Sequence, residues 1–161
     1  MRLALFQPDI PQNLGAAIRL CACLGVSLDV IEPCAFAIDD RTLRRAALDY
    51  RPLADIARHD GWRAFNAHEA RGEGRLVLFT TTGARPYLDF EFQAGDTLIF
   101  GRESVGVTEE VHARAQARLF IPMMAGARSM NVVTAAAMAL GEALRQTGGF
   151  PDPAGVFPPG A

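Results

Sequence analysis

The sequence predicts an α/β fold: a single domain with a mostly parallel sheet that is flanked by helices. Two observations lead to this prediction. The chain has 161 residues, of which 50% are hydrophobic, and this is enough for one substantial core. Short apolar runs with β-branched or aromatic side chains also alternate with helical patterns, which is typical of βαβ units. The expected strands are residues 3–6, 27–32, 75–81, 96–100 and 118–121.

Several of the segments between these strands have apolar residues at helical spacing, which predicts helices. Asp60 and Thr108 are candidate N-caps, and the acids that follow Thr108 lie in a first turn, where the helix dipole favours them. The apolar faces consist of Leu14, Ala17, Ile18 and Cys21 before Gly25, of Trp62 and Phe65, and of Val133, Ala136, Ala137, Leu140 and Leu144. We therefore expect a domain over residues 1–146. Residues 147–161 contain four prolines and four glycines, so we expect an extended or disordered tail.

The distribution of charge indicates one basic surface. A formal net charge of −2 argues weakly against a nucleic-acid partner. All sixteen basic residues are arginines, however, and six of them lie between residues 41 and 63 with only three acids, which gives a local charge of +3. Arg41, Arg44 and Arg45 have the spacing of one helix face. This face is either a contact for nucleic acid or an ordinary solvated surface.

Several functional classes lack support in the sequence. The three cysteines and three histidines do not have metal-ligand spacing, so we expect no metal site. No apolar run is long enough to span a membrane, and the N-terminus turns polar too early for a signal peptide, so we expect a cytoplasmic protein without membrane contact. The motifs G-x-G-x-x-G, G-x-x-x-x-G-K-[ST] and G-x-S-x-G are absent, which removes support for dehydrogenase, kinase and esterase functions.

Three polar loops follow predicted strands and define a candidate site. The carboxyl ends of parallel strands meet at one edge of a sheet, where ligands bind. The polar residues of these loops are Asn13, Glu103, Arg128, Ser129 and Asn131, and Arg19 lies about six residues beyond Asn13 in the first helix, close enough to reach this edge. Ser129 and Asn131 either cap the last helix or present polar groups to a ligand.

Three blocks of the sequence carry a resemblance to a known family. They are IPQNLGAAIRL (10–20), LIFGRESVG (98–106) and IPMMAGARSMNVVTAAAMAL (121–140). In this order and at this spacing they resemble the three motifs of the SPOUT class of RNA 2'-O-methyltransferases. Residues 31–50 are also similar to the branch of that class that modifies the wobble nucleotide of tRNA. The likeness extends from residue 1 to about residue 146.

The resemblance implies a structure and an activity. The expected fold contains a deep trefoil knot near the C-terminus, binds S-adenosylmethionine and forms an obligate homodimer with its active sites beside the interface. The expected reaction is 2'-O-methylation of the first anticodon nucleotide, cytidine or modified uridine, of tRNA, with leucine isoacceptors as substrates. Methylation of another tRNA or rRNA position, and a non-catalytic RNA-binding dimer, remain alternatives.

The resemblance also assigns roles to residues. It implies catalytic positions at Asn13, Arg19, Glu103, Ser129 and Asn131, cofactor contacts at Phe79, Gly101, Ile121 and Ser129, and RNA contacts at Arg41, Arg44 and Arg45. The family proposal makes the arginine at position 19 a base. Because a guanidinium group keeps its proton in proteins, we expect Arg19 to act instead as an electrostatic clamp on an alkoxide or a phosphate. The chain departs from the family at Arg102, where proline is frequent, and at Val132 and Val133, where a polar pair is frequent.

Overall fold

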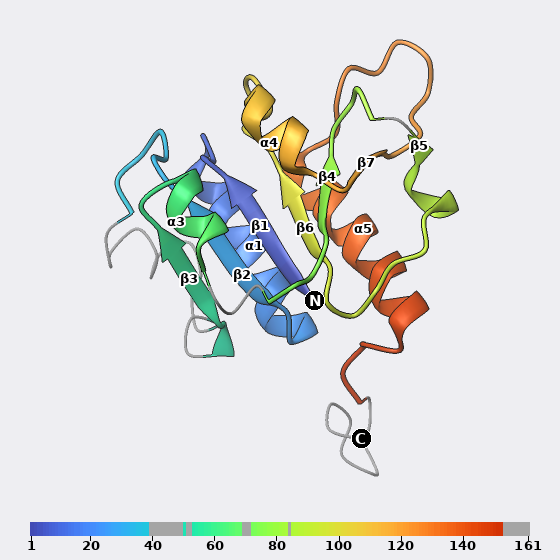
Figure 1. Cartoon of the computed structure of the whole chain (residues 1–161), viewed down its shortest axis with the longest axis horizontal. Helices are drawn as coiled ribbons and strands as arrows, with labels where there is room; N and C mark the ends of the chain where they lie inside the picture. Colours follow the sequence, from blue (N-terminus) through green and yellow to red (C-terminus); the bar gives the residue numbers. More distant parts are fainter. Residues whose placement is uncertain (39–49, 51–52, 69–71, 84, 153–161) are drawn as a thin grey trace.

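The computed structural model describes residues 1–38, 50, 53–68, 72–83 and 85–152. This part of the chain contains a seven-stranded sheet in the order β3, β2, β1, β6, β4, β7, β5, and every pair of neighbouring strands is parallel (Figure 1). The strands are β1 (Arg2–Phe6), β2 (Ser27–Ile31), β3 (Ile56–His59), β4 (Leu76–Phe79), β5 (Arg85–Pro86), β6 (Thr97–Phe100) and β7 (Ala117–Phe120). The α/β class with a parallel sheet is thus confirmed.

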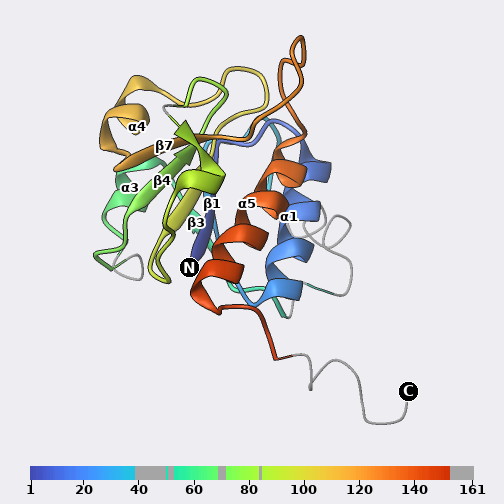
Figure 2. The ribbon, with the colours of Figure 1, turned by 90° about the vertical axis from the view of Figure 1, so that its right-hand side faces the viewer.

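Helices cover both faces of the sheet. They are α1 (Pro11–Leu24), α3 (Trp62–Asn66), the 3₁₀ helix η3 (Tyr87–Asp89), α4 (Glu109–Arg114) and α5 (Val132–Thr147). Figure 2 shows α1 and α5 side by side on one face, with α3 and α4 on the other. Each face has its own apolar cluster, because strands buried on both sides carry apolar residues in near-continuous runs. No helix in the described ranges is both long and apolar enough to cross a membrane.

The five strands expected from the sequence all exist, but two further strands were missed. Strand β3 has the sequence IARH, in which the polar Arg58 and His59 hide the apolar pattern. Strand β5 has only two residues and contains Pro86, which gives no strand signal. The expected cap at Asp60 is wrong, since the N-cap of α3 is Gly61. Thr108 is the N-cap of α4, although its side chain makes no capping hydrogen bond.

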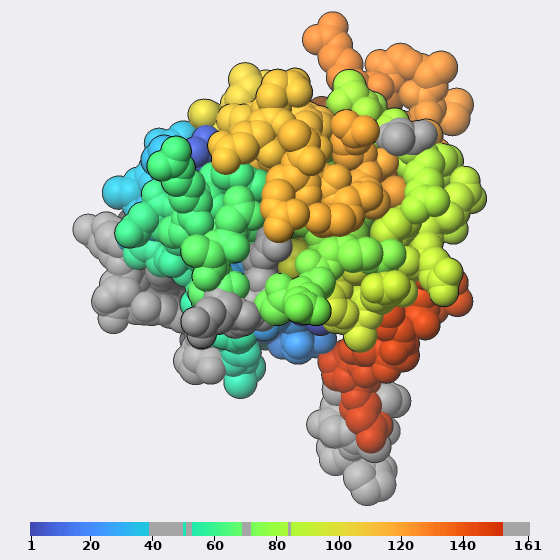
Figure 3. Space-filling view, in the orientation of Figure 1, coloured from blue at the N-terminus to red at the C-terminus, as the bar shows by residue number. Residues whose placement is uncertain are grey.

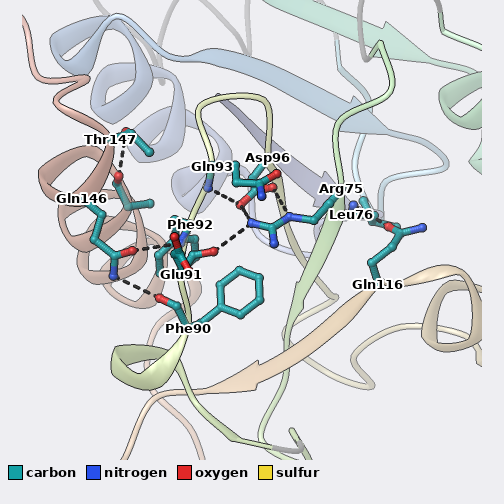
Figure 4. Close-up of polar contacts among 11 residues, drawn as sticks. Arg75, Leu76, Phe90, Glu91, Phe92, Gln93, Asp96, Gln116, Gln146 and Thr147 are labelled. Atoms are coloured by element: carbon teal, nitrogen blue, oxygen red, sulfur yellow. Dashed lines mark hydrogen bonds and ion pairs between the residues drawn. The ribbon is translucent and has the colours of Figure 1, made fainter.

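The C-terminal turn of α5 is tied to the segment that leads into β6 (Figure 4). The Gln146 side chain accepts a hydrogen bond from the Phe92 backbone nitrogen (2.9 Å) and donates one to the Phe90 carbonyl oxygen (3.1 Å). Nearby, the guanidinium of Arg75 donates to both carboxylate oxygens of the buried Asp96, at 2.8 and 2.7 Å. A buried carboxylate needs such a partner to offset its lost hydration. The two bonds of Gln146 hold the C-terminal end of α5 against this segment.

The connection from β4 to β5 crosses β7, because β7 lies between these two strands in the sheet. At the crossing, the backbone of Gly83 lies against the ends of Leu119 and Phe120. A Cβ atom at residue 83 would lie 2.5 Å from the Leu119 carbonyl carbon and 2.8 Å from the Phe120 nitrogen. Only glycine fits at such a crossing of two backbones.

The histidines are less isolated than the sequence suggested. The rings of His59 and His68 lie 4.8 Å apart, and Asp29 completes a group of possible metal ligands within 4.8 Å of one another. Both oxygens of Asp29 already have partners, however. They accept from Arg2 at 2.7 and 3.0 Å, and one of them also lies 2.7 Å from His59 Nε2. The nearby guanidinium cation and these bonds favour an internal ion pair, so the expectation of no metal site stays our prediction.

Candidate active site

A cavity of about 950 Å³ lies at the carboxyl edge of the sheet. The loops that follow β1, β4, β6 and β7 surround it, and Figure 1 shows the last three of these at the same end of the molecule. In the space-filling view, the loop after β7 stands out from the surface at this end (Figure 3). Eight of the residues expected at the site line the cavity: Asn13, Phe79, Gly101, Glu103, Ile121, Arg128, Ser129 and Asn131.

Three of these residues form a continuous line of hydrogen bonds, which we call the amide relay. The side-chain nitrogen of Asn13 donates to Glu103 Oε1 at 2.7 Å, and the side-chain oxygen of Asn13 accepts from Asn131 Nδ2 at 3.0 Å. Residues 90 and 118 positions apart in the sequence therefore meet through one amide. Asn13 is nearly buried, with only 8% of its surface exposed. The relay joins the loops after β6 and β7 to the first turn of α1.

The direction of the relay follows from the chemistry of Glu103. An ionised carboxylate only accepts hydrogen bonds, so Asn13 must present its NH₂ group to Glu103 and its oxygen to Asn131. Asn131 must then turn its own oxygen toward α5, where it accepts from the backbone nitrogens of Val133 (2.9 Å) and Thr134 (3.2 Å). Each amide orientation is thus set by the preceding partner, and the relay has a single polarity.

Asn131 combines the two roles that the sequence left open. It is the N-cap of α5, and it also faces the cavity as part of the amide relay. Ser129 does not cap α5 and is an exposed residue of the cavity wall. One asparagine therefore satisfies the helix terminus, which leaves Ser129 available for a bound molecule.

A second set of contacts surrounds Asp9, in the loop after β1. The Asp9 carboxylate accepts from the Arg102 guanidinium at 3.1 and 2.9 Å and from Ser104 at 3.0 Å (backbone nitrogen) and 2.6 Å (hydroxyl). These bonds, first the one from the Ser104 hydroxyl, hold the pKa of Asp9 below its usual value. We call Asp9, Arg102 and Ser104 the Asp9 clamp. Sequence reasoning missed Asp9, because an acid in a polar turn has no distinctive signal.

Gly101 permits the tight loop that carries Glu103. Arg102 and Gly106 exchange two backbone hydrogen bonds of 2.9 Å, which closes the intervening residues into a narrow turn. A Cβ atom on Gly101 would lie 2.5 Å from the carbonyl carbon of Gly106. Glycine is therefore needed at position 101 because the chain's own backbone approaches there, and the contact of Gly101 with a cofactor stays a prediction.

Aromatic side chains form an apolar part of the cavity wall. The rings of Phe79 and Phe100 are stacked, with centroids 4.9 Å apart and an angle of 12° between their planes. Both are nearly buried and line the cavity, which Ile121 also borders. The cavity wall therefore contains both apolar side chains and the carboxylate of Glu103. Threonines 80–82 and His112 also line it, and the sequence analysis did not select them.

Arg19 lies outside this cavity. Arg19 is an exposed residue of α1 and does not line the cavity of its own chain, and its guanidinium carbon lies 5.5 Å from the centre of the Tyr50 ring. Six residues along a helix correspond to a rotation of roughly 240° at 3.6 residues per turn, so Asn13 and Arg19 point in different directions. The expected RNA contacts Arg41, Arg44 and Arg45 lie outside the described residues.

Comparisons with known proteins place this geometry in context. The model of the SpoU rRNA Methylase family matches residues 1–141. A tRNA (cytidine(34)-2'-O)-methyltransferase of Beijerinckia indica subsp. indica is 53% identical over 146 residues, which cover 91% of each chain. A solved structure from work on the 2-OH methylation of C/U34 on tRNA has a TM-score of 0.82 and 43% identity, and the match covers 90% of this chain and 94% of that chain.

One solved structure with lower identity to this chain contains a bound ligand. The SpoU methyltransferase AviRb from Streptomyces viridochromogenes, solved in complex with AdoMet, has a TM-score of 0.78 and 26% identity. The match covers 91% of this chain and 60% of that chain.

Proposed function

This chain belongs to the SpoU rRNA methylase family, and we propose from that membership that it methylates the 2'-hydroxyl of nucleotide 34, the wobble position of tRNA. The substrate nucleotide is C or U. Similarity at 53% identity over nearly the whole chain supports this assignment. The single structural observation that carries it is the amide relay, because it joins residues of all three sequence motifs at one cavity.

S-adenosylmethionine is the methyl donor that we propose, and the residues present fit it. The stacked Phe79 and Phe100 suit an adenine ring, and the carboxylate of Glu103 suits a neighbouring positive charge. The cavity volume of about 950 Å³ is also adequate for a ligand of this size together with one nucleotide. When bound, S-adenosylmethionine supplies a methyl group on a positively charged sulfonium. Phe79, Gly101, Ile121 and Ser129 would hold it.

The side chains around the cavity act by positioning and by electrostatics. Transfer to a ribose oxygen requires an in-line approach and stabilisation of the charge that develops as the hydroxyl loses its proton. Ser129 and Asn131 orient the ribose, and Glu103, held by Asn13, keeps the loops around the donor in place. Arg19 stabilises the developing alkoxide or an adjacent phosphate as a permanently charged group.

Arg19 reaches a cavity in a homodimer, which is the second part of the proposal. Its exposed position on α1, outside the cavity of its own chain, supports supply to the cavity of a second copy. The small side chains of α5, among them the partly exposed Ala135 and Ala137, permit a close helix contact between two copies. Each active site then contains residues of both subunits.

Mixed dimers test this sharing of residues. The variants Arg19→Ala and Glu103→Gln are each expected to lose most methyl transfer as homodimers. After refolding from an equal mixture, half of the dimers contain one copy of each variant. In each of these mixed dimers one of the two sites has both native residues, so about a quarter of the wild-type activity returns. If Arg19 acted within its own chain, mixing would restore nothing.

Further parts of the proposal concern the fold and the tRNA. We place the deep trefoil knot near the C-terminus, and the crossing of β7 at Gly83 supports it. Arg41, Arg44 and Arg45 contact tRNA phosphates, so their loss is expected to flatten the salt dependence of tRNA binding.

Leucine isoacceptors are the proposed substrates, and the cytoplasm is the proposed location. The domain spans residues 1–146, with residues 147–161 as a tail.

Methyl transfer from tritiated S-adenosylmethionine into bulk tRNA, followed by mapping of the modified nucleotide, tests the function. We expect label at the 2'-oxygen of nucleotide 34 and none in the same tRNA with a 2'-deoxy nucleotide at that position. Label at another nucleotide would retain the enzyme class and contradict the substrate. Binding of cofactor and tRNA without any label would favour a non-catalytic RNA-binding dimer.

A further inference from the structure

The Asp9 carboxylate is saturated by its two neighbours in the clamp. Four hydrogen bonds reach it, two from Arg102 and two from Ser104, and only 14% of its side chain is exposed. A carboxylate with both oxygens engaged in this way is fixed in position and orientation. Asp9 does not line the cavity itself. Its function must therefore act through the residues that it holds.

The residues held by Asp9 flank Glu103 on both sides in the sequence. Asp9 Oδ1 binds Arg102, and Asp9 Oδ2 binds Ser104. The backbone nitrogen of Asp9 also donates to Glu103 Oε2 at 2.9 Å, while the other oxygen of Glu103 accepts from Asn13. Residue 9 thus contacts three consecutive residues of the loop after β6.

We infer that Asp9 is a positioning residue for Glu103, which it holds in register with Asn13 by bridging the loops after β1 and β6. This inference rests on the proposed function, since it takes Glu103 as a residue of the active site. Glu103 lies in a turn that the backbone pair of Arg102 and Gly106 closes. That pair fixes the shape of the turn but does not attach it to the loop after β1.

The role of Arg102 follows from the same geometry. The chain has arginine at a position where the family often has proline, and this arginine is bound to Asp9 at 2.9 Å. Its charge compensates the carboxylate close to the cavity wall, which reduces the repulsion between Asp9 and Glu103. The clamp therefore brings two carboxylates into adjacent loops at a small electrostatic cost.

A double-mutant cycle on the full-length protein tests the inference. We expect Asp9→Asn to lower kcat by about 10- to 100-fold, the effect of a small misplacement of a catalytic group, while the Kd for tRNA stays near that of the wild type. Asp9→Asn combined with Glu103→Gln is expected to be no slower than Glu103→Gln alone, because both changes remove the same group from its place. Amide hydrogen exchange of residues 102–106 is expected to rise in Asp9→Asn.

The control is Glu32→Gln, which removes a more exposed ion pair with Arg58. The two side chains lie 2.8 Å apart, and neither lines the cavity. The kcat of Glu32→Gln is expected to stay unchanged. Wild-type kcat in Asp9→Asn, or losses that multiply in the double variant, would overturn the inference. If Glu103→Gln loses methyl transfer and Asp9→Asn keeps the wild-type kcat, the inference alone fails. If Glu103→Gln keeps wild-type transfer, the proposed role of Glu103 fails and the inference fails with it.

Discussion

The substitution Asn13→Asp is expected to lower methyl transfer by about 100-fold or more, the scale of losing one preorganised polar contact in an active site. The new side chain has the same shape but cannot donate to Glu103, whose oxygen lies 2.7 Å from the Asn13 nitrogen. Two carboxylates then face each other at hydrogen-bond distance, and they repel. Glu103 and the loop that carries it must move away from α1, and the amide relay breaks at its centre.

The measurement is single-turnover transfer of tritiated methyl to tRNA, scaled to the folded fraction that thermal unfolding gives. This scaling is needed because breaking a nearly buried hydrogen bond also costs stability, about 1–3 kcal/mol. Gln12→Glu is the matched control, since it adds one negative charge to the exposed neighbour in the same helix. Its transfer rate should stay within about twofold of the wild type, as expected for an exposed charge. A rate in Asn13→Asp close to that of the control would show that the relay is dispensable.

Only part of the amide relay could be predicted from the sequence. Loops that follow parallel strands meet at the carboxyl edge of the sheet, so the convergence of residues 13, 103 and 131 was predictable from their places after predicted strands. The pairing itself was not, because Asn13 and Glu103 are 90 residues apart and no local pattern connects them. For Arg19, the sequence predicted a proximity that the structure does not show within one chain. Its distance along α1 suggested the same edge, but its rotation around the helix axis directs it away from the cavity of its own chain.

The edge strands show a similar limit in the fold. Strands β1 and β6 lie in the middle of the sheet, so both of their faces are apolar and their sequences stand out. Strands β3 and β5 lie at the two edges, where one side of the strand has no partner and polar residues or proline are tolerated. The sequence signal therefore fades where burial decreases. Clamp residue Asp9 was missed for a related reason, since its partners become visible only after folding.

Gly83→Ala is expected to have the largest effect on stability. The added methyl group would lie 2.5 Å from the Leu119 carbonyl carbon and 2.7 Å from the Leu119 oxygen, both backbone atoms that no rotamer change can displace. Strand β7 is held at this point between β4 and β5, and the Thr80 nitrogen donates to the same Leu119 oxygen at 2.9 Å. We expect a loss of roughly 3 kcal/mol or more in the free energy of unfolding, beyond ordinary overpacking of a side-chain core.

Gly95→Ala provides the comparison that isolates this crossing. A methyl group there meets only the Cα of Gly74, at 3.8 Å, which is ordinary van der Waals contact. Both substitutions restrict the unfolded chain in the same way, so the difference between them reports the native contact. Calorimetric Tm values and urea midpoints of the two variants give that difference. Equal stability in both would mean that the two backbone segments separate easily at Leu119, and the support that Gly83 lends to a knotted chain would then be lost.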